Sequence, residues 1–109
     1  MLVISNYKKG DVITIKLSTG EEVVARFDSD NDNEVKIVKP TVLTLNPQDG
    51  TVMLVAWLMS IDTMTSDAVN IYKSQIVAIS KPHKGISDGY LHSTTGIARA
   101  STMESSLLI

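Results

Sequence analysis

The fold is decided by the stretch Asn70-Ile-Tyr-Lys-Ser-Gln-Ile-Val77, which follows a Leu17-Ser-Thr-Gly20 turn by about fifty residues. In a strand over residues 71–79, Tyr72, Ser74 and Ile76 would face one way and Lys73, Gln75 and Val77 the other, because successive side chains of a strand point to opposite faces. The same alternation surrounds Gly20, whose freedom to adopt a positive φ suits a tight hairpin. The residues expected to face inward in this first hairpin are Ile13, Ile15, Leu17, Val23, Ala25 and Phe27.

Between these two stretches the sequence continues as short strands separated by turn residues, the pattern of an all-β chain. Residues 28–33 form a polar loop, and a third strand passes through Val35 and Ile37. Pro40 interrupts that strand, and because proline lacks an N–H donor we expect a bend there. Residues 46–50 then predict a turn.

Residues 51–61 form an unusual strand because both of its faces are apolar. One face carries Val52, Leu54, Ala56 and Leu58, and the other carries Met53, Val55, Trp57, Met59 and Ile61. A single small antiparallel barrel covers only one face of such a strand. The second face is covered either by a terminal segment of the same chain or by another subunit, and we favour a subunit interface.

The composition describes an ordinary single domain of 109 residues, with a formal net charge of −2 and no cysteine. The pI is near 5.5, so the chain lacks the overall basic character that is typical of nucleic-acid-binding proteins. We expect a cytoplasmic protein that neither crosses nor binds a membrane, because no apolar run approaches the ~20 residues of a spanning helix. Residues 1–82 are expected to form the barrel. Residues 83–109, rich in Ser, Thr and Gly, are expected to form a tail that is flexible or packed on the barrel.

The sequence contains no arrangement of residues typical of a catalytic or metal site, so we predict neither enzyme activity nor a cofactor. There is no cysteine nucleophile and no Gly-x-Ser-x-Gly motif. His83 and His92 are nine positions apart with no evident third ligand for a metal. Glu21 and Glu22 are adjacent in a strand, so their carboxylates point to opposite faces.

Two short motifs resemble those of the Sm/LSm family, which includes the Hfq-like proteins. The first contains an apolar strand, a glycine turn, a second apolar strand and a polar loop, represented here by Gly20, Val23, Ala25, Phe27, Asp28 and Asn33. The second places Tyr72, Lys73 and Ser74 before an apolar strand, with Ser74 where the family has Gly or His. The resemblance implies a five-stranded, strongly bent antiparallel barrel of Sm (SH3) type. The proportions of the chain are similar to those of divergent Sm-like proteins of bacteriophages.

The family resemblance also implies a homo-oligomeric ring of six or seven subunits. Family rings form when the fourth strand of one subunit pairs with the fifth strand of the next, which removes the exposed sheet edges. The residues expected at this interface are Val55, Trp57, Met59 and Val77.

The resemblance further implies a site for short uridine-rich single-stranded RNA. Lys73 would contact the phosphate, Asn31 or Asn33 would read a base edge, and Tyr72 and Ser74 would flank the site. The alternative for Lys73 is an ion pair with a neighbouring carboxylate. A six-membered ring would carry about −12, six times −2, and this charge favours a second hypothesis, a structural or adaptor ring that binds a protein partner without nucleic acid.

Overall fold

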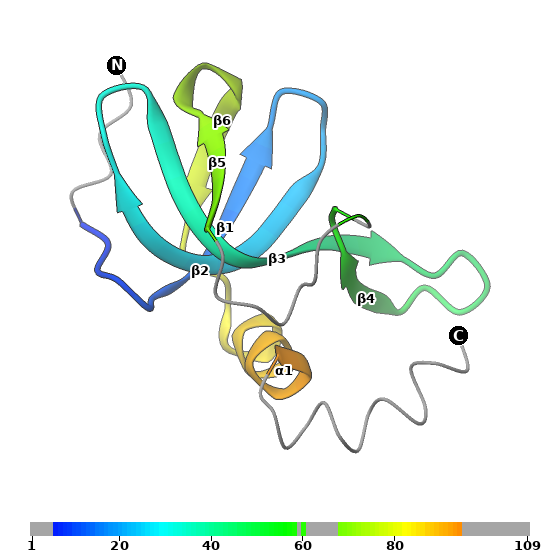
Figure 1. Ribbon diagram of the computed structural model, residues 1–109. Coiled ribbons are helices and arrows are strands. Elements are labelled where there is room, and N and C mark those ends of the chain that lie inside the picture. The colour runs from blue at the N-terminus through cyan, green and yellow to red at the C-terminus, as the bar shows by residue number, and fades with distance from the viewer. Residues whose placement is uncertain (1–5, 59, 61–67, 95–109) are drawn as a thin grey trace.

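The computed structural model describes residues 6–58, 60 and 68–94, which form an antiparallel sheet and one short helix (Figure 1). The elements, in chain order, are β1 Val12–Leu17, β2 Glu22–Asp30, β3 Glu34–Leu45, β4 Val52–Ala56, β5 Ala68–Tyr72, the 3-10 turn η1 Lys73–Gln75, β6 Ile76–Ser80 and the helix α1 Lys84–Thr94. This architecture agrees with the antiparallel β fold that the alternation predicts.

The sheet has six strands in the order β4-β3-β2-β1-β6, and β5 also pairs with β3. Both β4 and β5 lie on the edge of β3 that β2 leaves open: β5 pairs with residues 34–38 and β4 with residues 41–45. Five strands were expected, because residues 71–79 read as one continuous strand. The turn η1 divides that stretch, so β5 adds to β3 while β6 adds to β1, and the sheet is not closed by pairing.

The expected bend at Pro40 is confirmed as a β-bulge. The register of β2 and β3 shifts so that Lys39 and Pro40 together lie opposite Ala25, and Lys39 has a φ of 52°. A bulge tolerates proline because its extra residue makes no ladder hydrogen bond. The bend separates the first half of β3, which covers the core, from its second half, which projects with β4 as a hairpin (Figure 1).

The inner face of the curved sheet holds the core, and the hairpin residues expected to point inward all contribute to it. The core residues are Ile13, Ile15, Leu17, Val23, Ala25, Phe27, Val35, Ile37 and Ile71. Tyr7 closes one end, with its ring 6.3 Å from that of Phe27 and its hydroxyl donating to the carbonyl of Ile79 at 3.3 Å. The period-two pattern therefore predicted this face correctly.

The outer face of the sheet is partly covered by α1, which lies in the segment that the sequence assigned to the tail (Figure 1). Tyr90 is fully buried, and its hydroxyl donates to the carbonyl of Lys39 at 2.7 Å. Val24 is also fully buried, although the alternation places it on the outer face. The helix therefore attaches to the bend of β3 through one aromatic side chain.

Candidate functional site

The residues expected to bind RNA are brought together at one corner of the sheet. The loop between β2 and β3 contains Asn31 and Asn33, and it lies beside the end of β5, where Tyr72 leads into η1. Glu34 faces Tyr72 in the register of β3 and β5, and the backbone N–H of Lys73 donates to the carbonyl of Asn33 at 2.7 Å. Strand pairing therefore joins two segments that are about forty residues apart in the sequence.

Lys73 already has an anionic partner at this corner. Its Nζ lies 2.9 Å from Oδ2 of Asp30, and only 11% of the Lys73 side chain is exposed. A charge-assisted hydrogen bond of this length is stronger than one between neutral groups. The ion pair that the sequence left as the alternative to RNA binding is therefore present within the chain, and it neutralises the cation.

The surrounding loop is acidic and has its own internal hydrogen bonds. Oδ1 of Asn31 accepts from the backbone N–H groups of Asn33 and Glu34, at 2.9 and 2.8 Å, so this side chain organises the turn. The carboxylates of this corner belong to Asp28, Asp30, Asp32 and Glu34. Asp28 is paired with Lys9 and Asp30 with Lys73, so the negative charge that disfavours a phosphate comes from Asp32 and Glu34. Tyr72, with 63% of its surface exposed, and Ser74, also exposed, have the accessibility that a stacking or polar contact needs.

The residues expected at a subunit interface are distributed over β4 and β6. Val55 is 40% exposed and Val77 is 66% exposed. Trp57 instead packs partly against the core, and its Nε1 donates to Oε2 of Glu21 at 3.2 Å. Met59 lies outside the described residues. In the described part of the sheet β4 pairs only with β3 and β6 only with β1, so each strand has one free edge.

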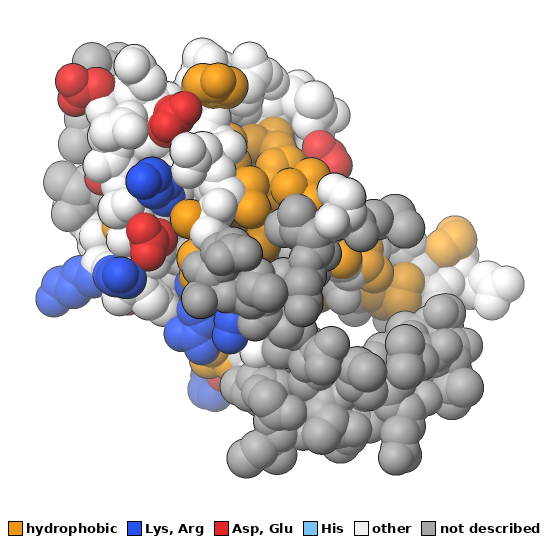
Figure 2. Space-filling model, viewed as in Figure 1, with side chains coloured by type: hydrophobic (Ala, Val, Ile, Leu, Met, Phe, Trp, Pro, Cys, Tyr) orange, Lys and Arg blue, Asp and Glu red, His pale blue; other side chains and the backbone are white. Residues whose placement is uncertain are grey.

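The β3–β4 hairpin adds Leu45 to the exposed apolar residues of the strand that the sequence identified as apolar on both faces. Leu45 and Val52, close to its turn, are both more than half exposed. Figure 2 shows hydrophobic side chains along the middle of one face and on this hairpin. The strand itself is shorter than residues 51–61, because β4 ends at Ala56.

Next to Trp57 lies an apolar pocket of about 250 Å³ that the sequence did not predict. Trp57 and Tyr72 contribute its aromatic walls, together with Leu17, Glu21, Asn70 and Gln75. Oγ of Ser18 donates to Oε1 of Gln75 at 2.6 Å at the rim. Sequence reasoning missed this pocket because its two aromatic residues belong to different segments, and no spacing rule relates them.

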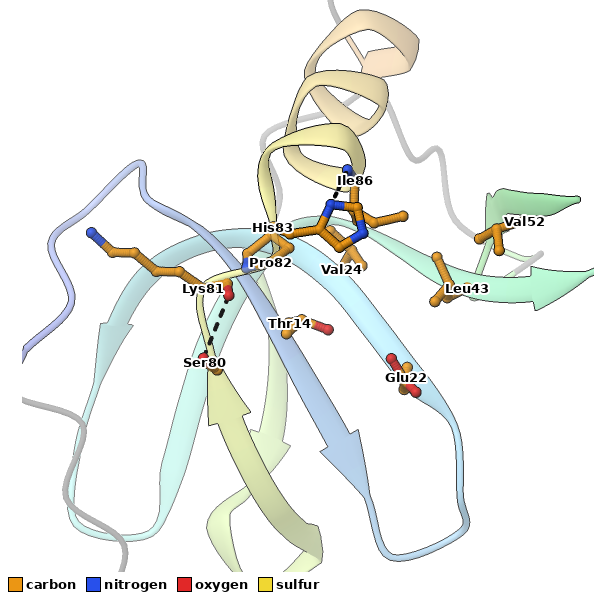
Figure 3. Close-up of a pocket in the computed structure, with 10 residues that line it drawn as sticks. All are labelled: Thr14, Glu22, Val24, Leu43, Val52, Ser80, Lys81, Pro82, His83 and Ile86. Carbon is orange, nitrogen blue, oxygen red and sulfur yellow. Dashed lines mark hydrogen bonds between the residues drawn. The ribbon is translucent and has the colours of Figure 1, made fainter.

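A larger pocket, of about 390 Å³, lies between the outer face of the sheet, the β3–β4 hairpin and the start of α1 (Figure 3). Val24, Leu43 and Val52 give it an apolar wall, and Ile86 of α1 faces them. His83 has a structural role here, because its Nδ1 accepts from the N–H groups of Gly85 and Ile86, at 3.1 and 3.4 Å. The imidazole thus caps α1 by accepting from donors that have no partner inside the helix.

Within the described part of the chain, no group of three or more His, Cys, Asp or Glu side chains is placed to hold a metal ion. Burial raises the pKa of Tyr90 well above its usual range, so this phenol remains neutral. Across the same residues, no helix has the length and apolar character needed to cross a bilayer.

Neither protein-family models nor curated protein sequences match this chain. The structure therefore defines a class only at the level of architecture: a small, bent, antiparallel β domain with a C-terminal helix on its outer face.

Proposed function

We propose that this chain is a non-catalytic assembly module of the Sm-like small-barrel type, whose copies form a ring and engage a protein partner. The observation that carries this proposal is the pair of free strand edges on β4 and β6, which bear the exposed Val55 and Val77. A free edge presents unpaired N–H and C=O groups and invites pairing with another chain.

The order of the strands supports an Sm-type ring. Because β4 and β5 share one edge of β3, together they take the place of the fourth strand of the family, and β6 takes the place of the fifth. Pairing of β4 in one copy with β6 in the next would satisfy both edges and generate a closed, cyclic assembly of six or seven subunits. We place this assembly in the cytoplasm, a compartment that the absence of cysteine permits.

Burial of the exposed apolar side chains would favour this association. Each large aliphatic side chain that is fully removed from water contributes about 1.5–3 kcal/mol. A stable interface buries roughly 1,200–2,000 Å² in total, more than two valines supply, so Leu45 and Val52 are expected to participate as well.

A second candidate function, binding of uridine-rich single-stranded RNA, is favoured by the convergence of Asn31, Asn33, Tyr72, Lys73 and Ser74 at one corner. The exposed ring of Tyr72 offers a surface on which a base can stack. The Lys73–Asp30 ion pair and the acidic loop oppose this function, and for this reason we rank the protein partner first.

The test of assembly is the mass of the particle by light scattering at micromolar concentration. We expect an oligomer for the native sequence and a monomer for Val77→Asp, since the new carboxylate would be buried without a partner at the interface. Ser74→Asp is the matched control, because it adds the same charge at an exposed position in η1, outside both edges. A native protein that is a monomer, or a Val77→Asp variant with unchanged mass, contradicts the proposal.

A further inference from the structure

A third pocket, which we call the Arg26 pocket, lies between α1 and the outer face of the sheet. Its volume is about 310 Å³, and the residues used below are Asp11, Arg26, Lys81, Ser87 and Leu91. Arg26 comes from β2, Lys81 follows β6, and Ser87 belongs to α1. The pocket therefore joins three elements that the sequence analysis did not connect.

Arg26 is partly buried and has no carboxylate partner in the described part of the chain. Its Nη1 donates to the carbonyl of Gly10 at 3.3 Å, and no described Asp or Glu oxygen lies within 4.0 Å of the guanidinium. A guanidinium has five N–H donors, and within the described part of the chain one of them has a protein acceptor. The Tyr90 hydroxyl cannot balance this charge, because burial raises its pKa and keeps it neutral. Arg26 thus has unused capacity for an anion.

Lys81 supplies a second cation that is only weakly held. Its Nζ lies 4.0 Å from Oδ2 of Asp11, at the limit of an ion pair, and 65% of its side chain is exposed. The same oxygen of Asp11 accepts from the backbone N–H of Lys8 at 3.0 Å, so the carboxylate is committed to that turn. Lys81 can therefore turn toward a ligand without breaking a strong contact. With one carboxylate against two cations, the pocket has a net charge of +1.

We propose that the Arg26 pocket binds a phosphate group. The guanidinium of Arg26 donates two parallel hydrogen bonds, Lys81 contributes a point charge, and the Ser87 hydroxyl donates from α1. Donors that approach from three elements suit the oxygens of a phosphate better than the two oxygens of a carboxylate. The phosphate can come from a small phosphorylated molecule or from the backbone of a single-stranded polynucleotide. This inference does not depend on the proposed assembly, nor on an RNA site at Lys73.

The test is a titration of inorganic phosphate at low salt, followed by the amide NMR signals of Ser87 and Leu91. For Arg26→Gln we expect at least about a tenfold loss of affinity, the effect of about 1.4 kcal/mol, which is near the lower end for a hydrogen bond to a charged group. Lys16→Gln is the matched control, because it removes one positive charge from an exposed lysine of β1 that does not line the pocket, and this variant should bind phosphate with unchanged affinity. Equal weakening in both variants, or no shift of the Ser87 and Leu91 signals in the native protein, overturns the proposal.

Asp11→Asn gives a second test, in which the affinity for phosphate should rise rather than fall. It removes the one carboxylate among the described residues that line the pocket, while its side-chain oxygen can still accept from the N–H of Lys8. We expect phosphate to bind several-fold more tightly to this variant, because like-charge repulsion is relieved. An unchanged or weaker affinity contradicts the assignment of the pocket. Light scattering on each variant separates a loss of assembly from a loss of binding.

Uridine monophosphate, uridine and poly-U then distinguish the two sources of phosphate. A small-molecule site binds uridine monophosphate as well as it binds inorganic phosphate, and uridine binds weakly or not at all. A polynucleotide site binds poly-U more tightly than the monophosphate, and the slope of log affinity against log salt falls by about one in Arg26→Gln. Binding of uridine that equals binding of its monophosphate contradicts recognition through phosphate.

Discussion

Lys73 and Arg26 are both basic side chains with restricted exposure, but their surroundings differ. Lys73 lies 2.9 Å from Asp30 in an acidic loop, whereas Arg26, four residues before Asp30 on β2, has no carboxylate within ion-pair distance in the described structure. The lysine is the one that a family motif singles out, and the arginine belongs to no motif. The comparison teaches that the availability of a charge depends on what the fold places beside it.

The largest effect is expected for Tyr90→Ala, which removes the side chain that attaches α1 beside Arg26. The ring is fully buried, so its loss should lower the free energy of unfolding by about 3–5 kcal/mol, as for other large aromatic residues in cores. Urea denaturation measures this change. Tyr90→Phe keeps the ring and loses the hydroxyl, which donates to the carbonyl of Lys39 at 2.7 Å and lies 3.4 Å from that of Val38, so it should lower the free energy of unfolding by about 0.5–1.5 kcal/mol. Equal costs for both variants would show that packing of the ring contributes little.

The next largest loss in the free energy of unfolding is expected for Asp30→Ala, because this variant leaves the nearly buried Lys73 without its partner. Removing one partner of a fully buried ion pair lowers the free energy of unfolding by about 3–5 kcal/mol. Because Asp30 is partly exposed, we expect a loss of about 1–2 kcal/mol. The measurement is again urea denaturation. Asp32→Ala is the control, since it removes a charge from the same loop and has no ion pair in the described structure, and it should change stability by less than about 0.5 kcal/mol.

Arg26→Gln should change stability by less than about 1 kcal/mol in the absence of phosphate, because no ion pair is lost. If its cost instead equals that of Asp30→Ala, Arg26 has a structural role like that of Lys73, and the contrast between the two residues fails. Phosphate should raise the thermal midpoint of the native protein and leave that of Arg26→Gln nearly constant, since only a ligand that binds the folded state stabilises it.

The smallest effect on stability is expected for Asp88→Asn, which removes the exposed Lys84–Asp88 ion pair of α1. This pair is a reference for the more buried Lys73–Asp30 pair. The hydrogen bond from Lys84 to Asp88, together with their charge attraction, raises the pKa of Lys84 above its ordinary value of 10.5. A raised pKa stabilises the folded state below the unfolded pKa, and this contribution is lost as the pH rises through the folded pKa. The thermal midpoints of the native protein and Asp88→Asn should therefore differ slightly below about pH 10 and converge above it. A difference that grows with pH contradicts this sign.

The sequence predicted the parts of the fold that depend on local chemistry. Alternation around Gly20 identified the inward side chains of the first hairpin, and Pro40 located the bend of β3. The number of strands was missed because η1 interrupts an alternating stretch without glycine or proline, so no local signal marks the change of partner from β3 to β1. For residues 83–109 the sequence left open whether the tail is flexible or packed, because α1 buries Tyr90 and Thr94 and has no apolar stripe that would signal packing.

By itself, the sequence determined the antiparallel character of the sheet and the inner faces of β1 and β2, because backbone geometry makes side chains alternate along every strand. It also selected the two segments that meet at the Lys73 corner. Only the tertiary structure decided that Asp30 neutralises Lys73, that Arg26 has no carboxylate partner among the described residues and that Tyr90 is buried. The physical reason is that electrostatic interactions and burial depend on distances between residues far apart in the chain, and only the packing of β2, η1 and α1 sets those distances.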